Sequence, residues 1–143
     1  MKSNNYIKLE FPSKSVNEGY ARSAVAAFAA QMDPTLEELG DIRTAVSEAV
    51  TNAIVHAYPD GIGTIRIKAR ILEEDKLEIV VSDKGRGIAN LEQAMEPLYT
   101  TGGEDRSGMG FTIMESFMTN LEISSQPGKG TTVHMRRKLQ RRK

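Results

Sequence analysis

The sequence predicts an α+β fold, a two-layer α/β sandwich in which helices cover one face of a mixed, mostly antiparallel β-sheet. Three observations support this prediction. Segments of alternating polarity, typical of half-buried strands, occur near both ends of the chain and in its middle. Two segments between residues 15 and 58 repeat apolar residues at helical spacing. A turn of three acidic residues joins two strand-like segments, which favours a hairpin.

The chain is expected to start with a strand and a helix. Residues 6–11 alternate in polarity and predict the strand. Residues 15–31 predict the helix, for which Ser13 or Ser15 would be the N-cap. Its larger apolar residues are Val16, Tyr20, Val25 and Phe28. The alanines around them indicate close packing against another surface.

A second, longer helix is predicted to follow directly. Asp33 would be its N-cap and Pro34 its first helical residue. The helix is expected to run to about Tyr58, where Pro59-Asp60-Gly61 ends it. Gly40 is a weak point that could divide the helix into two.

The second half of the chain is predicted to hold two strand pairs and one helix. Residues 62–72 and 76–82 form a hairpin around the turn Glu73-Glu74-Asp75. Residues 83–107 are loop-like, with a short helical piece near 91–95. The remaining elements are a helix over 111–119 and strands over 121–125 and 131–137.

Composition limits the class of protein. With 143 residues, 39% hydrophobic and 27% charged, residues 1–143 are interpreted as a single soluble domain. No apolar run reaches the roughly 18 residues of a membrane span, and the chain does not start with a signal-peptide segment. The absence of cysteine excludes disulfides and Cys-ligated zinc. A cytoplasmic protein without membrane contact is expected.

The net charge of zero is unevenly distributed along the chain. Residues 136–143 hold six of the 19 basic residues and no acidic one, which leaves residues 1–135 with a net charge of −6. A basic tail can contact nucleic acid, but the acidic body argues against that. We therefore expect a frayed, solvated chain end and no direct nucleic-acid partner.

Glu48 and Asn52 lie one turn apart in the second predicted helix. They are separated by about 40° around the helix axis and lie away from its apolar stripe. That stripe consists of Leu39, Ile42, Val46, Val50, Ala53 and Ala57. A carboxylate can accept a proton, and an amide oxygen suits Mg²⁺. Taken alone, such a pair is more often two solvated residues on an exposed helix face.

Two glycine-rich segments and one threonine are candidates for nucleotide binding. Asp83-Lys84-Gly85-Arg86-Gly87 follows a strand, where glycines let the backbone approach a ligand and Asp83 can accept a hydrogen bond from an amino group such as adenine's. Ser107-Gly108-Met109-Gly110-Phe111 opens a helix, whose N–H groups and dipole favour anions. Thr131 offers a hydroxyl to a phosphate. A plain turn, a loop-to-helix junction and an ordinary strand threonine are the respective alternatives.

In their order and spacing, these motifs resemble the ATPase superfamily of gyrase B, heat-shock protein 90, histidine kinases and the mismatch-repair ATPase. The resemblance covers nearly the whole chain and implies the Bergerat (GHKL) ATP-binding fold. The P-loop, the G-x-G-x-x-G signature and the H-R-D kinase loop are missing. Ser-Glu-Ala-Val-Thr-Asn-Ala-Ile-Val-His at 47–56 and Arg-Ser-Gly-Met-Gly-Phe-Thr-Ile-Met at 106–114 are similar to the small anti-sigma serine kinases, especially the sporulation type.

The resemblance implies a role for each motif. Asn52 would bind Mg²⁺, Asp83 would contact adenine, and Glu48 would be the general base for a serine hydroxyl. Residues 95–107 would be the ATP lid. Arg106 would help to neutralise the γ-phosphate, with an exposed lid arginine as the alternative. The residues that contact ATP, or ADP as product, would be Asn52, His56, Asp83, Gly85, Gly87, Thr101, Ser107, Gly108, Met109, Gly110 and Thr131.

The resemblance also implies partners. One is a sigma factor of the sporulation sigma F type, bound and silenced; the other is an anti-anti-sigma factor, phosphorylated on serine. A homodimer is expected. The helix over 15–31, with Asn17 and Arg22, is a candidate docking surface, and a purely structural helix is the alternative.

Three other functions remain open from the sequence. The first is a general-stress anti-sigma kinase. The second is a nucleotide-gated binding module without kinase activity, against which the presence of Glu48 argues. The third is an isolated histidine-kinase catalytic domain, which is disfavoured because no acceptor domain is present and because His56 is interpreted as a neighbour of the nucleotide or a structural residue.

Overall fold

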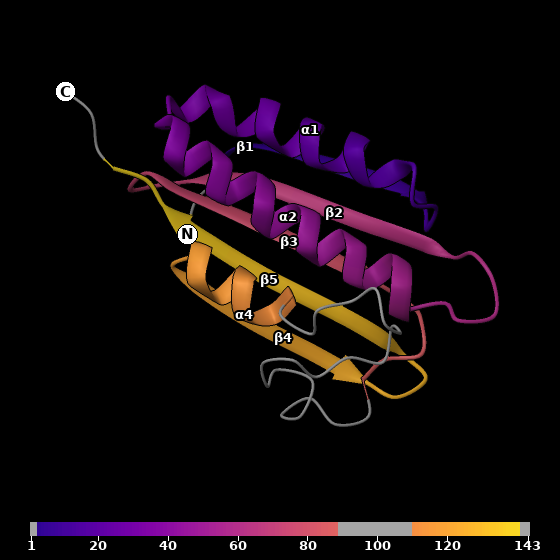
Figure 1. Ribbon diagram of the computed structural model, residues 1–143. Helices are drawn as coiled ribbons and strands as arrows, with labels where there is room; N and C mark the ends of the chain where they lie inside the picture. The colour runs from indigo at the N-terminus through magenta and orange to yellow at the C-terminus, as the bar shows by residue number, and fades with distance from the viewer. Residues whose placement is uncertain (1–2, 89–109, 141–143) are drawn as a thin grey trace.

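The computed structural model describes residues 3–88 and 110–140, whose elements form two layers (Figure 1). One layer is a five-stranded sheet in the order β1-β2-β3-β5-β4. Its strands are β1 (Ser3–Pro12), β2 (Thr64–Leu72), β3 (Lys76–Asp83), β4 (Asn120–Gln126) and β5 (Gly130–Lys138). The other layer holds α1 (Asn17–Ala29), the 3-10 turn η1 (Ala30–Met32), α2 (Leu36–His56) and α4 (Gly110–Phe117). The predicted α+β sandwich is confirmed, and every pairing between the described strands is antiparallel.

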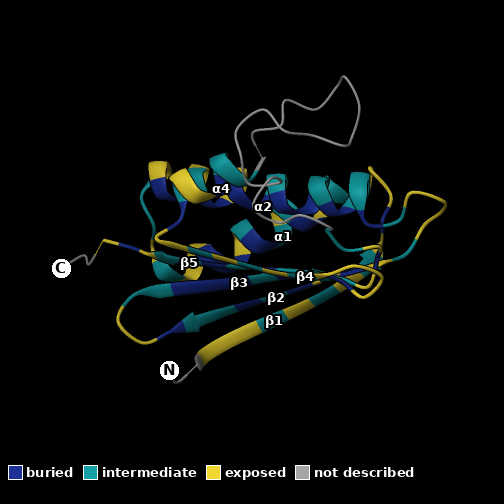
Figure 2. Ribbon diagram, turned by 90° about the horizontal axis from the view of Figure 1, so that it is seen from below, coloured by how far each residue is buried: buried dark blue, intermediate teal, exposed yellow. Residues whose placement is uncertain are grey.

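The helices pack on one face of the sheet, and the core lies between the two layers (Figure 2). In β2 the buried residues Ile65 and Ile67 alternate with Arg66 and Lys68, so one face of the strand is apolar. Burying an aliphatic side chain of this size stabilises the fold by roughly 1.5–3 kcal/mol. The predicted apolar stripe of α2 covers that face, with Leu39 only partly buried. No helix in the described ranges has the length and apolarity to cross a bilayer.

The start of α2 differs from the prediction. Thr35, not Asp33, is the N-cap: its Oγ1 accepts a hydrogen bond from the Glu38 N–H at 3.0 Å, while Glu38 Oε1 accepts one from the Thr35 N–H at 2.8 Å. This capping box satisfies two backbone donors reciprocally. Asp33 instead adopts a left-handed φ of 53°, and Pro34 precedes the helix. Gly40 lies inside a continuous helix, which is not divided.

The cap and the apolar face predicted for the first helix were also wrong in part. Neither predicted serine caps α1, which follows Val16 without a side-chain cap. Ser13 is buried, and its hydroxyl instead accepts a hydrogen bond from the Gly63 N–H at 3.0 Å. Val16 and Tyr20 are 73% and 79% exposed, so the first turn of the predicted face lies in solvent. The residues of α1 that reach the core are Ala21, Val25, Phe28 and Ala29.

The described part of the basic C-terminal segment is ordered, contrary to the predicted frayed end. Arg137 of β5 pairs with Asp41 of α2 at 2.9 Å. Leu139 is buried, and the Gln140 N–H donates a hydrogen bond to Glu38 Oε2 at 2.7 Å. This segment therefore ties the end of β5 to the start of α2.

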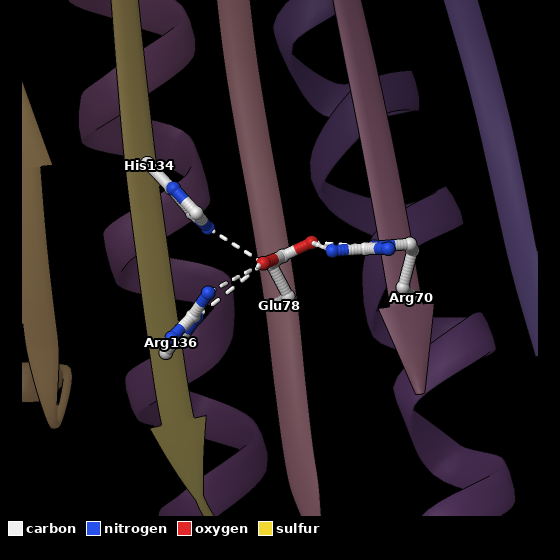
Figure 3. A network of polar contacts seen from close by, with 4 residues as sticks. All are labelled: Arg70, Glu78, His134 and Arg136. Carbon is white, nitrogen blue, oxygen red and sulfur yellow. Dashed lines mark hydrogen bonds and ion pairs between the residues drawn. The ribbon is translucent and has the colours of Figure 1, made fainter. Parts of the chain in front are cut away.

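A buried carboxylate lies on the sheet face opposite the helices (Figure 3). Glu78 of β3 is 2% exposed; its Oε2 lies 2.7 Å from His134 Nε2 and 3.2 Å from Arg136 Nη2, while Arg70 pairs with Oε1. Burial alone would raise the pKa of Glu78, but hydrogen bonds and charge from His134 and Arg70 outweigh burial and lower it. The ionised carboxylate therefore links β2, β3 and β5 through Arg70, His134 and Arg136.

Candidate nucleotide site

Three segments that are distant in sequence meet at one end of the sheet (Figure 1): the end of α2, the loop after β3, and the β4–β5 turn. The Arg86 N–H donates a hydrogen bond to the Ala57 carbonyl at 2.8 Å, which ties the loop to the end of α2. The Gly128 N–H donates to the Arg86 carbonyl at 2.6 Å, which ties the turn to the same loop. Asp83 and Thr131 are cross-strand partners beside these contacts. Two of the predicted site residues are thereby brought together.

The predicted glycines of this loop permit close approach of backbone to backbone. A Cβ on Gly85 would lie 2.1 Å from the Ala57 carbonyl oxygen. A Cβ on Gly87, whose φ is 74°, would lie 2.1 Å from the Gln126 carbonyl oxygen. Both separations are far shorter than a van der Waals contact. A side chain at either position would push the loop away from α2 or from the β4–β5 turn.

Asp83 holds its carboxylate in a defined orientation at the end of β3. Its Oδ1 accepts hydrogen bonds from the Gly85 N–H at 2.9 Å and the Thr131 N–H at 3.3 Å. Within the described part of the chain, Oδ2 accepts no hydrogen bond. Burial raises the pKa of Asp83, and the two backbone hydrogen bonds oppose that rise only in part. One anchored and one available oxygen suit an acceptor for an exocyclic amino group.

The hydroxyl of Thr131 is part of a small polar network. Its Oγ1 lies 2.8 Å from Ser125 Oγ, which also accepts a hydrogen bond from the Ile88 N–H at 2.7 Å. Sequence reasoning did not single out Ser125. Its pairing with Thr131 follows from the β4–β5 register, in which the two residues are cross-strand partners.

Glu48, Asn52 and His56 occur at four-residue intervals along α2 and share one side of the helix. All three side chains are half-buried. His56 is the last residue of α2 and precedes Ala57, the contact point of the Asp83 loop. Glu48 lies about 12 Å back along the helix axis from His56, at 1.5 Å per residue. His56, Asn52 and Glu48 therefore form a row of side chains that runs from the Asp83 loop toward the middle of α2.

Glu48 also lines a groove of about 320 Å³ between α1 and α2. The other lining residues are Arg22, Gly40, Arg43, Thr44 and Ser47. Glu48 therefore borders a groove that two arginines also line.

Among the predicted site residues that the structure describes, Asn52 is the one predicted to bind a metal. No cluster of three or more His, Cys, Asp or Glu side chains that could hold a metal occurs within residues 3–88 and 110–140. Mg²⁺ typically keeps several waters and takes one or two protein ligands together with phosphates. The single amide oxygen of Asn52 fits that mode.

Part of the predicted site lies outside the described residues. These positions are the lid over 95–107, with Thr101 and Arg106, and the residues Ser107, Gly108 and Met109. Gly110 is the first residue of α4.

Comparison with known proteins defines the class. A family model described as the histidine kinase-like ATPase domain matches residues 11–137, so the chain belongs to this ATP-binding family. It is 59% identical over 136 residues to the anti-sigma F factor of Caldanaerobacter subterraneus subsp. tengcongensis, covering 94% of each chain. It is 56% identical over 139 residues to that of Clostridium beijerinckii, covering 96% of each chain. Within the ATPase family, the chain therefore belongs to the anti-sigma F factors.

Solved structures support the same fold. The structure of the RsbU and RsbW domains of a Mycobacterium tuberculosis protein aligns with a TM-score of 0.70 at 19% identity, over 95% of this chain and 32% of that one. The histidine kinase domain of the blue-light activated kinase of Erythrobacter litoralis aligns with a TM-score of 0.60 at 23% identity, over 85% of this chain and 61% of that one. At these levels of sequence identity, the similarity to the two solved structures supports the fold alone.

Proposed function

We propose that this chain is an anti-sigma factor that binds a sporulation sigma factor and uses Mg·ATP to phosphorylate a serine of its protein antagonist. The main support is its 59% identity, over 94% of its length, to a protein named anti-sigma F factor. Glu48 on the same helix side as Asn52 adds the chemical support. A binding module would need only the nucleotide site, whereas phosphoryl transfer also profits from a base.

The nucleotide would lie along the row of α2 residues that begins beside the Asp83 loop. Asp83 Oδ2 accepts a hydrogen bond from the adenine amino group, and Gly85 and Gly87 keep the loop close to α2. His56 neighbours the nucleotide, and the amide oxygen of Asn52 is a ligand of Mg²⁺. The remaining contacts are assigned to Thr101, Ser107, Gly108, Met109, Gly110 and Thr131.

Phosphoryl transfer depends mostly on positioning and charge neutralisation. When bound, Mg²⁺ would supply charge neutralisation at the phosphates. Glu48 accepts the proton of the acceptor serine, or orients a water that does so, and Arg106 balances charge that develops on the γ-phosphate. The groove between α1 and α2 supports this assignment because Glu48 is one of the residues that line it.

The protein partners follow from the same proposal. The sigma factor and the anti-anti-sigma factor compete for the chain by mass action, and α1 with Asn17 and Arg22 is one docking surface for them. A homodimer holds the sigma factor. Because sigma factors act on RNA polymerase, the proposal places the chain in the cytoplasm, as one domain over residues 1–143.

Two alternatives remain. A general-stress anti-sigma kinase would share the same site and differ in its sigma target, and the names of the relatives favour the sporulation type. A nucleotide-gated binding module would bind the sigma factor without transferring phosphate.

The deciding experiment incubates the chain with labelled ATP, Mg²⁺ and a candidate antagonist protein, and maps the labelled residue. Glu48→Gln should lower the transfer rate by about 100-fold or more with ATP affinity unchanged. Asn52→Ala should weaken the Mg²⁺-dependent part of ATP binding. Glu37→Gln, on the exposed first turn of α2, is the matched control. Transfer at the normal rate by Glu48→Gln would refute the base assignment, and nucleotide-dependent sigma binding without any transfer would favour the binding module.

A further inference from the structure

Tyr58, two residues beyond the last residue of α2, joins two loops that are separate in sequence. Its hydroxyl donates a hydrogen bond to the Thr64 carbonyl at 2.7 Å and accepts one from the Lys84 N–H at 3.0 Å. Thr64 is the first residue of β2, and Lys84 directly follows Asp83. A single hydroxyl therefore uses its donor and an acceptor to hold a strand start and the Asp83 loop together.

The position of the Tyr58 ring depends on a missing side chain. A Cβ at Gly63 would lie 2.2 Å from the Cε1 and Cζ atoms of the ring, so the ring lies directly against Gly63. A Cβ at Gly61, two residues earlier in the same loop, would have nothing within 4 Å. Alanine is therefore expected to displace the ring at the first position and to be tolerated at the second.

The loop after Asp83 is also held by Ala57, the residue that follows the last residue of α2. The Ala57 carbonyl accepts the Arg86 N–H at 2.8 Å, and Tyr58 accepts the Lys84 N–H, so the two contacts lie on either side of Gly85. The Gly85 N–H in turn donates to Asp83 Oδ1 at 2.9 Å. Because this bond orients the carboxylate, any shift of residues 84–86 changes the direction of Oδ2.

We infer that Tyr58 is a positioning residue for purine recognition, which sets the Asp83 carboxylate relative to the helix that carries Glu48 and Asn52. The inference rests on the adenine contact proposed for Asp83. A residue that acts in this way affects recognition of the amino group more than binding of the phosphates. A purely structural residue would weaken all nucleotides alike.

The test compares ATP with purine riboside triphosphate, which lacks the exocyclic amino group, by calorimetry with Mg²⁺. Wild-type protein should bind ATP more tightly than the analogue. Tyr58→Phe keeps the ring and removes the hydroxyl. It should lower the affinity for ATP about fivefold, which is the effect of roughly one hydrogen bond. The affinity for the analogue should fall less. Gly63→Ala should reduce the preference for ATP over the analogue, because it displaces the Tyr58 ring. Gly61→Ala should bind both nucleotides like the wild type.

The inference is overturned if Tyr58→Phe keeps the wild-type preference for ATP over the analogue, whether both nucleotides lose affinity equally or neither loses any. A wild-type chain without any preference for ATP over the analogue would instead refute the Asp83 assignment itself. If Tyr58→Phe does not fold, as judged by circular dichroism, Gly63→Ala decides the question because it retains the hydroxyl.

Discussion

Replacing Asp83 by asparagine should weaken nucleotide binding without lowering the stability of the fold. The asparagine Oδ1 can accept the same hydrogen bonds that Gly85 and Thr131 now donate at 2.9 and 3.3 Å. The amide nitrogen would take the place of Oδ2, so that a donor would face the adenine amino group. The variant thus keeps the loop anchored and removes both a charge and an acceptor.

The effect on ATP affinity and the effect on stability have different physical causes. A hydrogen bond to a charged group contributes about 1.5–3 kcal/mol, so ATP affinity should fall about 10- to 150-fold. Burial raises the pKa of Asp83 above its ordinary 3.8, so the carboxyl favours folding when protonated and loses that contribution as pH rises through the raised pKa. At neutral pH the uncharged asparagine should therefore be at least as stable as the wild type.

Calorimetry with Mg·ATP measures the first effect, and thermal unfolding without nucleotide measures the second. Asp60→Asn, an exposed position just beyond α2, is the control and should change neither quantity. The stability difference between wild type and Asp83→Asn should shrink as pH falls through the raised pKa toward the ordinary value of 3.8, and should change no further below it. ATP affinity within twofold of wild type, or a lower midpoint of unfolding at neutral pH, would refute the reasoning.

Two further predictions concern packing and the open sheet face. Gly85→Ala places a Cβ 2.1 Å from the Ala57 carbonyl oxygen and should lower the free energy of unfolding by about 1–3 kcal/mol. Urea unfolding measures this loss, with Gly61→Ala as control, and an unchanged midpoint would contradict the close packing. Glu78→Gln should destabilise the protein at neutral pH by about 1–3 kcal/mol, because its cationic neighbours lose their charged partner. Since the pKa of Glu78 is lowered, the wild-type advantage exists above its ordinary 4.5 and disappears as pH falls through the lowered value. Thermal unfolding of both proteins across that range checks this, and a difference independent of pH would argue against it.

The element order could be predicted well because it depends on short-range patterns. The β2–β3 hairpin turn, for example, occurs at the predicted acidic residues, with positive φ at Glu74 and Asp75. The predicted starts of the helices were less accurate than the element order. Asp33 and Thr35 are both good N-caps, and Thr35 is selected because Glu38, three residues later, can close the capping box. Thr35 and Glu38 have capping-box spacing in the sequence, and this spacing predicts Thr35 as the N-cap of α2.

The contacts of Glu78 and Tyr58 could not be predicted from the residues that neighbour them in the sequence. Alternation around Glu78 is typical of a strand, but its partners Arg70 and His134 lie 8 and 56 residues away and meet it only in the observed strand register. Tyr58 was interpreted as the end of a helix, whereas its hydroxyl bonds Lys84, 26 residues further along the chain.

Within residues 3–88 and 110–140, the sequence by itself determined which segments become helices and strands, and it placed Glu48 and Asn52 on one side of a helix. Helical and strand periodicities act over a few residues, which is why the sequence is sufficient for this. Only the tertiary structure decided that Asp83 meets Thr131, 48 residues away, and that Gly85 lies against Ala57. Such contacts depend on strand register and on the packing of α2 on the sheet, which are properties of the whole folded chain.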